Sequence, residues 1–194
     1  LNSTGDKNTA VGKGALFANT TADNNTAVGT DALLQNTTGS ENVAVGNNAL
    51  DANTTGQYNV GVGSQALTNS TTASENVAVG MFSSLETTTG NTNTSVGTYS
   101  LQENTTGNSC TAIGYQALQD NNGDDNTALG KAFFRENTSG TQGTAVGIFA
   151  LKLNTTGSNN TAVGSQSLEA NTTAANNTAV GYLALTANTT GGDN

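Results

Sequence analysis

The side chains that most enzymes use for catalysis are scarce in this chain. It has no His and a single Cys, Cys110. Ser-His and Cys-His dyads and ordinary zinc sites are therefore excluded, because they need an imidazole or several thiolates. The only adjacent acids, Asp124 and Asp125, are typical of a solvated turn. We expect no catalytic residue, no cofactor site and no metal site, and therefore no enzyme.

Phosphate-binding and calcium-binding motifs are also missing from the sequence. Gly12-Lys13 and Gly130-Lys131 lack the earlier Gly and the following Ser or Thr of a phosphate-binding loop. The calcium-binding nonapeptide G-G-x-G-x-D does not occur. Amide and hydroxyl side chains therefore remain as the groups that could carry a modification or bind a ligand.

Asn-x-Thr triplets recur along the chain and could carry sugar. The pattern N-x-[ST] is the acceptor for N-glycosylation, and once-per-repeat spacing would cover one edge of the molecule with glycans. The alternative is an Asn ladder that is hydrogen-bonded from turn to turn, with the Asn-Thr composition alone generating the matches. The candidate glycosylation sites are Asn19, Asn36, Asn53, Asn104, Asn137, Asn154, Asn171 and Asn188.

Paired threonines such as Thr37-Thr38 raise the separate question of ice binding. Ice-binding solenoids display T-x-T on a flat face. Adjacent residues of a strand point to opposite faces, so these two hydroxyls would not share a surface. Ice or carbohydrate binding therefore stands as an alternative function.

The charge of the chain limits its partners. The net charge is −9 and charged residues make up 10% of the chain. Nucleic acid is not expected as a partner, because its binders carry a basic stripe. Anionic membrane surfaces are also disfavoured as partners, because the chain is itself negatively charged. No apolar run approaches the length of a membrane span. We expect no membrane insertion in this segment.

A single 17-residue repeat organises all of these residues. Its consensus is N-T-A-V-G-x-x-A-L-x-x-N-T-T-G-x-x, whose positions we number from 1. The Gly of position 5 recurs from Gly12 to Gly181 in steps of 17, except for a step of 16 before Gly130, where the turn 121–123 has lost one Thr. We expect residues 1–194 to form one continuous all-β solenoid, a parallel β-roll of about eleven repeats cut from a longer array. The strand after the shortened turn should keep its place.

Positions 2 to 4 predict a short strand in each coil, since they contain β-branched residues. We expect position 4 to face inward and to form the core with position 9. Positions 6 to 11 are rich in Ala, Leu and Gln and favour a corner or short helical turn. The predicted core residues are Val11, Val28, Val45, Val62, Val79, Val96, Ile113, Leu129, Val146, Val163 and Val180 at position 4, and Leu16, Leu33, Leu50, Leu67, Leu101, Leu118, Phe134, Leu151, Leu168 and Leu185 at position 9.

Position 3 is Ala, Gly or Ser in all eleven copies. If it faces outward, its small size indicates close packing against another copy of the chain, which predicts a homo-oligomer. The alternative is a flattened coil in which position 3 faces inward against the opposite wall. The Gly of position 5 indicates a positive φ or a close backbone approach.

The unit N-T-A-V-G-x-x-A, with variants Asn42-Val43-Ala44-Val45-Gly46 and Thr111-Ala112-Ile113-Gly114, resembles the S-V-A-I-G-x-x-A repeats of trimeric autotransporter adhesin heads. It is also similar to repeats of phage tail-fibre proteins. The resemblance covers the whole chain, once per repeat. It implies a trimer of left-handed parallel β-rolls with small residues packed toward the three-fold axis.

These observations predict a structural role. We expect a fibre or filament segment of an extracellular surface appendage, adhesive or glycan-displaying, located at the cell surface. One alternative is a phage tail-fibre shaft in a virion tail, and the other is an ice- or carbohydrate-binding solenoid. The expected partners are copies of the chain itself, as a trimer or filament, and cell-surface or carbohydrate ligands.

Overall fold

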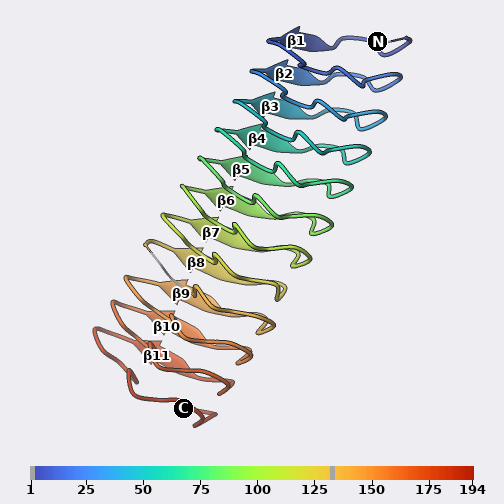
Figure 1. Ribbon diagram of the computed structural model, residues 1–194. Helices are drawn as coiled ribbons and strands as arrows, with labels where there is room; N and C mark the ends of the chain where they lie inside the picture. The colour runs from blue at the N-terminus through green and yellow to red at the C-terminus, as the bar shows by residue number, and fades with distance from the viewer. Residues whose placement is uncertain (1–2, 132–133) are drawn as a thin grey trace.

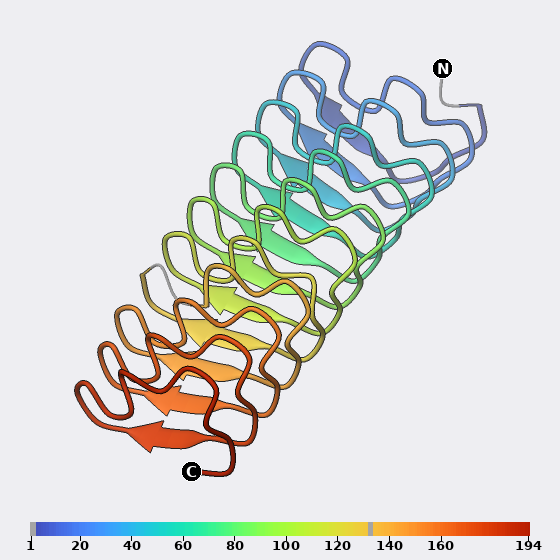
Figure 2. The ribbon, with the colours of Figure 1, turned by 60° about the horizontal axis from the view of Figure 1, so that its bottom comes forward.

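The computed structural model describes residues 3–131 and 134–194 and shows an all-β parallel solenoid. Each coil contributes one three-residue strand, and the eleven strands form a single parallel sheet in the order of the sequence (Figure 1). Figure 2 shows the strands following one wall of the stack from end to end. The strands are β1 (Thr9–Val11), β2 (Thr26–Val28), β3 (Val43–Val45), β4 (Val60–Val62), β5 (Val77–Val79), β6 (Thr94–Val96), β7 (Thr111–Ile113), β8 (Thr127–Leu129), β9 (Thr144–Val146), β10 (Thr161–Val163) and β11 (Thr178–Val180).

The strands pair in strict register, so each repeat position lies over the same position of the next coil. Thr26 pairs with Val43, and Val28 pairs with Val45. The 16-residue coil keeps this register, because Ile113 of β7 pairs with Leu129 of β8. The prediction that the lost residue leaves the next strand in place is confirmed.

Positions 6 to 11 form turns, so of the two predicted forms the corner is confirmed and the helical turn is not found in the described residues. Positions 7 and 9 adopt left-handed backbone angles, as in Asp31 (φ 56°) and Leu33 (φ 51°), which a right-handed helix does not allow. The N–H of Asp31 donates to the carbonyl of Lys13 in the preceding coil at 2.8 Å, and that of Leu33 donates to Ala49 in the following coil at 3.0 Å. These two N–H groups bond to neighbouring coils, and the bonds within a coil are single turns, such as that from the N–H of Asn36 to the carbonyl of Leu33 at 3.3 Å.

The strand faces the core with position 3, which reverses the predicted orientation. Ala27 of β2 is fully buried, whereas Val28 is 36% exposed. A Cβ built on Gly61 of β4 would lie 3.4 Å from Cδ1 of Leu50. The two walls are therefore so close that only a small residue fits opposite Leu. The position-4 residues assigned to the core instead point outward and are exposed or half-buried: Val11, Val28, Val45, Val62, Val79, Val96, Ile113, Leu129, Val146, Val163 and Val180.

The core is a column of position-9 residues covered by the small residues of positions 3 and 8. The buried members are Leu16, Leu33, Leu50, Leu67, Leu101, Leu118, Phe134, Leu151 and Leu168. Leu185 is 40% exposed, because no further coil is stacked on it in the structure. The apolar column is divided into two clusters near Ser84, which takes the place of Leu. There the hydroxyls of Ser83 and Ser84 lie 2.7 and 2.8 Å from that of Ser95.

Candidate functional surfaces

The described residues contain no pocket and no group of three or more side chains that could hold a metal ion. Asp124 and Asp125 are exposed. Within residues 3–131 and 134–194, no helix is long and apolar enough to cross a membrane. The features that could carry function are therefore the columns of identical residues that the register creates.

The Asn residues of position 12 lie inside the stack. The Nδ2 of Asn36 donates to Oδ1 of Asn19 in the preceding coil at 3.2 Å and to the carbonyl of Gly39 at 2.8 Å. A glycosyltransferase cannot reach an amide that is buried and bonded in this way, so the folded chain favours the ladder over N-linked sugar. Asn188 in the last coil is partly exposed. The buried candidates are Asn19, Asn36, Asn53, Asn104, Asn137, Asn154 and Asn171.

A second Asn column, at position 1, was not singled out from the sequence. The Oδ1 of Asn25 accepts the backbone N–H of Asn42 in the next coil at 2.9 Å. Its Nδ2 donates at 2.9 Å to the carbonyl of Gly39, the same carbonyl that Asn36 reaches. The two columns therefore meet at one carbonyl in the coils that have Asn at both positions, as Asn42 and Asn53 do at Gly56. The available signal was the presence of Asn at position 1 in nine of eleven copies.

Cys110 replaces Asn in this second column and acts as a buried structural residue. Its Sγ donates to the carbonyl of Gly123 at 3.2 Å, and the Nδ2 of Asn121 lies 3.3 Å from the same sulfur. Burial raises the pKa of the Cys110 thiol to about 11. The thiol is therefore protonated at neutral pH and does not serve as a nucleophile.

The outward residues of the sheet form one uncharged surface, which we call the sheet face and define as positions 2 and 4 of β1 to β11. Position 2 is Thr in eight strands and Val in three. Position 4 is aliphatic in all eleven, and most of these side chains are more than one third exposed. The apolar character extends at position 6 to Met81, Tyr115, Ile148 and Tyr182.

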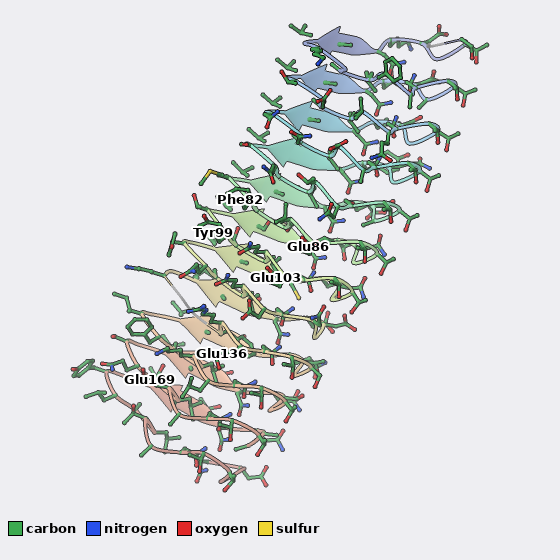
Figure 3. All side chains as sticks on the ribbon, in the orientation of Figure 1. Phe82, Glu86, Tyr99, Glu103, Glu136 and Glu169 are labelled. Atoms are coloured by element: carbon green, nitrogen blue, oxygen red, sulfur yellow. The ribbon has the colours of Figure 1, made fainter. Side chains whose placement is uncertain are left out.

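Aromatic side chains stack along the neighbouring edge in the middle of the molecule (Figure 3). The rings of Phe82 and Tyr99 are parallel, with centroids 5.3 Å apart, and Tyr115 meets Tyr99 edge-on at 6.0 Å. The Nζ of Lys131 lies 5.9 Å from the centre of the Tyr115 ring. The ring faces are thus largely used within the chain, which favours a stabilising role over ligand stacking.

Four acids follow one another in the position-11 column: Glu86, Glu103, Asp120 and Glu136. Partial burial raises the pKa of Glu103, and the carboxylates of Glu86 and Asp120 raise it further. Burial also raises the pKa of Asp120, against the opposing effect of Arg135. Like charges stacked in register repel one another, so this column opposes folding at neutral pH.

The substitution Glu103→Gln is expected to raise the melting temperature at pH 7 by about 1–2 °C. A carboxyl whose pKa is higher in the folded than in the unfolded chain costs stability above those pKa values, and the cost fades as the pH falls. The gain should therefore vanish in thermal melts below pH 4.5, the ordinary pKa of this group. Glu75→Gln is the control, because its column neighbours are Tyr58 and Thr92. An equal gain from Glu75→Gln would contradict the repulsion.

No protein-family model matches this chain, and no curated protein or solved structure matches it. The parallel β-solenoid is established by the register and hydrogen bonds of the chain itself.

Proposed function

We propose that this chain is a structural rod of an extracellular fibre, without catalytic activity, and that copies of it associate through the sheet face. The observation that carries the proposal is the uncharged, half-apolar surface that runs along all eleven strands. Exposed apolar patches larger than a few hundred Å² mark interaction sites on soluble proteins.

The dimensions of the sheet face suit a second copy of the chain. Eleven strands spaced ~4.8 Å apart extend over about 50 Å, and positions 2 to 4 add about 7 Å of width. These dimensions give a flat area of about 350 Å². The surface of the side chains and the exposed residues of position 6 add to it, against roughly 800 Å² per partner in an interface of standard size. Every copy presents the same column, so symmetric association can bury it completely.

The resemblance to adhesin heads and phage tail fibres supports the same proposal. Both are fibrous assemblies, and the adhesin head is a trimer. The small residues of position 3 lie inside the coil here, so positions 2 and 4 would face the partner chains. Adhesin-type fibre and phage tail-fibre shaft are the two forms of the proposal, and the cell surface or virion tail is the corresponding location.

Ice binding is a second candidate for the same face. In eight strands the outward pair is Thr followed two residues later by an aliphatic residue, as in Thr161 and Val163. Hydroxyl and methyl groups are thus repeated at regular intervals on a sheet whose strands pair in strict register. The adjacent threonines of positions 13 and 14 do not form such an array. A monomer with this surface would be free to adsorb to ice.

The triple substitution Val45→Glu, Val79→Glu and Ile113→Glu is expected to weaken self-association by about a hundredfold or more, because each Glu would place an unpaired charge in an apolar interface. Sedimentation equilibrium measures the mass over a range of concentrations, and circular dichroism checks the fold. The control carries three Glu at the exposed turn positions Thr38, Thr72 and Thr106, which lie in alternate coils as the three sheet-face positions do, and should associate like the parent.

A parent chain that is monomeric at high concentration would overturn the self-association proposal. If that monomer shapes ice crystals and the triple variant does not, ice binding takes its place. If neither activity is present, the sheet face serves neither role.

A further inference from the structure

Position 14 of the repeat carries a hydroxyl residue in every coil that has a residue there. We call these residues the hydroxyl column. Each lies exposed on the N-T-T-G turn that precedes a strand, at the coil edge on the right in Figure 1. The members are Thr4, Thr21, Thr38, Thr55, Thr72, Thr89, Thr106, Ser139, Thr156, Thr173 and Thr190.

The hydroxyls of this column make no hydrogen bond within the described residues, unlike those of the adjacent position 13. The Oγ1 of Thr37 donates to the carbonyl of Thr54 at 2.9 Å, and that of Thr54 donates to Thr71 at 3.0 Å. The side chains of Thr38 and Thr55 have no such partner, and only their backbone N–H groups bond to the next coil. The fold therefore uses the hydroxyl of position 13 and leaves that of position 14 free.

The 16-residue coil shows that the fold does not need a residue at position 14. Its turn is closed by Asn122, whose Oδ1 accepts the backbone N–H of Thr105 at 2.8 Å and that of Thr106 at 3.3 Å. β8 nevertheless pairs in register with β7 and β9. A requirement of folding does not account for a hydroxyl in all the other coils.

Exposure does not account for the hydroxyl either. Position 17, which is also exposed and lies three residues further on, includes Lys7, Glu41, Tyr58 and Gln142. Exposed positions of this chain diverge freely where nothing restricts them. The restriction at position 14 concerns the hydroxyl itself, which points to a group outside the chain.

We infer that the hydroxyl column is a set of attachment sites for O-linked sugar. A covalent glycan needs an accessible nucleophile and no pocket, which is what this turn offers. Every residue of the column is exposed, so the hydroxyls lie at the surface of the rod. Sugars would line the edge of the rod at a rung spacing of ~4.8 Å, so crowding should leave neighbouring coils only partly occupied.

The step is a glycosyl transfer from a nucleotide-activated sugar, catalysed by a separate transferase. The threonine Oγ1 forms a bond to the anomeric carbon as the bond from that carbon to the diphosphate breaks. The nucleoside diphosphate leaves with the electron pair, and the hydroxyl proton passes to a base of the transferase. This inference does not depend on association through the sheet face.

The test is mass spectrometry of the protein isolated from the cells that make it, with fragmentation that keeps labile side-chain groups attached. We expect mass increments of whole monosaccharides, localised to Thr38, Thr55, Thr156 and Thr173 among others, with Asn36 and Asn53 unmodified. An unmodified chain, sugar on other residues or a phosphoryl group at these threonines would overturn the inference.

Matched variants produced in the same cells separate the site from the fold. Thr38→Val with Thr55→Val should remove the sugars of those two coils and leave the melting temperature within about 2 °C, since no hydrogen bond is lost. Thr37→Val with Thr54→Val removes two hydroxyls that donate to backbone carbonyls, and should lower stability while leaving the sugars at Thr38 and Thr55. A reversed outcome for the two pairs would show that position 14 is structural.

Discussion

Replacing Gly97 with Ala is expected to destabilise the protein by about 3 kcal/mol or more. Gly97 has a φ of +131°, a conformation that L-residues rarely adopt, and a Cβ at this residue would lie 2.5 Å from the carbonyl oxygen of Gly114. Neither coil can move away easily, because the N–H of Gly97 is bonded to Val79 at 2.8 Å and β6 is paired on both sides. Urea unfolding monitored by circular dichroism measures the loss.

Gly61→Ala is the matched control for this prediction. Gly61 lies at the inward position of β4 and has no positive φ, and its Cβ would lie 3.3 Å from the carbonyl oxygen of Ala66. Its neighbours in the column, Ala44 and Ala78, already carry that methyl group. The substitution should leave stability within about 1 kcal/mol, on the stabilising side. Equal losses at Gly61 and Gly97 would refute the role of backbone angle and coil contact.

Phe134 and Gly143 are expected to be strongly coupled in a double-mutant cycle. Phe134 stands where most coils have Leu, and Gly143 stands where most have Asn. A Cβ on Gly143 would lie 2.4 Å from Cε1 of Phe134 and 2.6 Å from Cζ, so the ring occupies the space of the absent Asn side chain. Each residue therefore compensates for the other.

Gly143→Asn alone should cost about 2–3 kcal/mol by overpacking. Phe134→Leu alone should cost about 1–2 kcal/mol by leaving a cavity. The double variant restores the consensus pair and should be at least as stable as the parent, with a coupling of about 3 kcal/mol or more. Chemical denaturation of the four proteins provides the cycle. Additive losses would mean that the two sites are independent.

The period and the inner column could be predicted from the sequence because they depend on spacing alone. Leu at position 9 is the only large apolar residue that lies inside most coils. Gly at position 5 has both the positive φ and the close approach to a neighbouring backbone that its type predicts. Gly46, for example, has a φ of +141°, and a Cβ added to it would lie 2.3 Å from the carbonyl oxygen of Gly63.

The inner face of the strand was predicted wrongly because apolar character was given more weight than size. Val28 is more apolar than Ala27, yet the space opposite Leu admits only a methyl group. The sequence did contain the contrary signal at position 2, which shares a face with position 4. Thr at that position, as in Thr26, would have placed a hydroxyl in the core if Val28 faced inward.

The conformation of positions 6 to 11 could not be predicted from helix propensity. Leu33 and its equivalents adopt a left-handed conformation that costs on the order of 1 kcal/mol or more for a non-Gly residue. Burial of the side chain and the bonds to the next coil offset this cost, and both arise only after the coils have stacked. The same holds for the Asn column of position 1, whose partners lie 14 and 17 residues away.

The uniform pattern of hydrogen bonds between coils means that mutations of the gene can change the length of the rod by whole coils. In most coils the N–H of position 5 bonds to the preceding coil, and those of positions 2 and 9 bond to the following one, as in Gly46, Val43 and Leu50. When recombination between repeats removes one coil, the two coils that come together already present matching groups. Each such event shortens or lengthens the rod by ~4.8 Å without creating a new kind of interface. Deletions of other sizes must be accommodated within a turn, as at Asn122. The length of the rod can therefore change in steps of one coil while its cross-section stays constant.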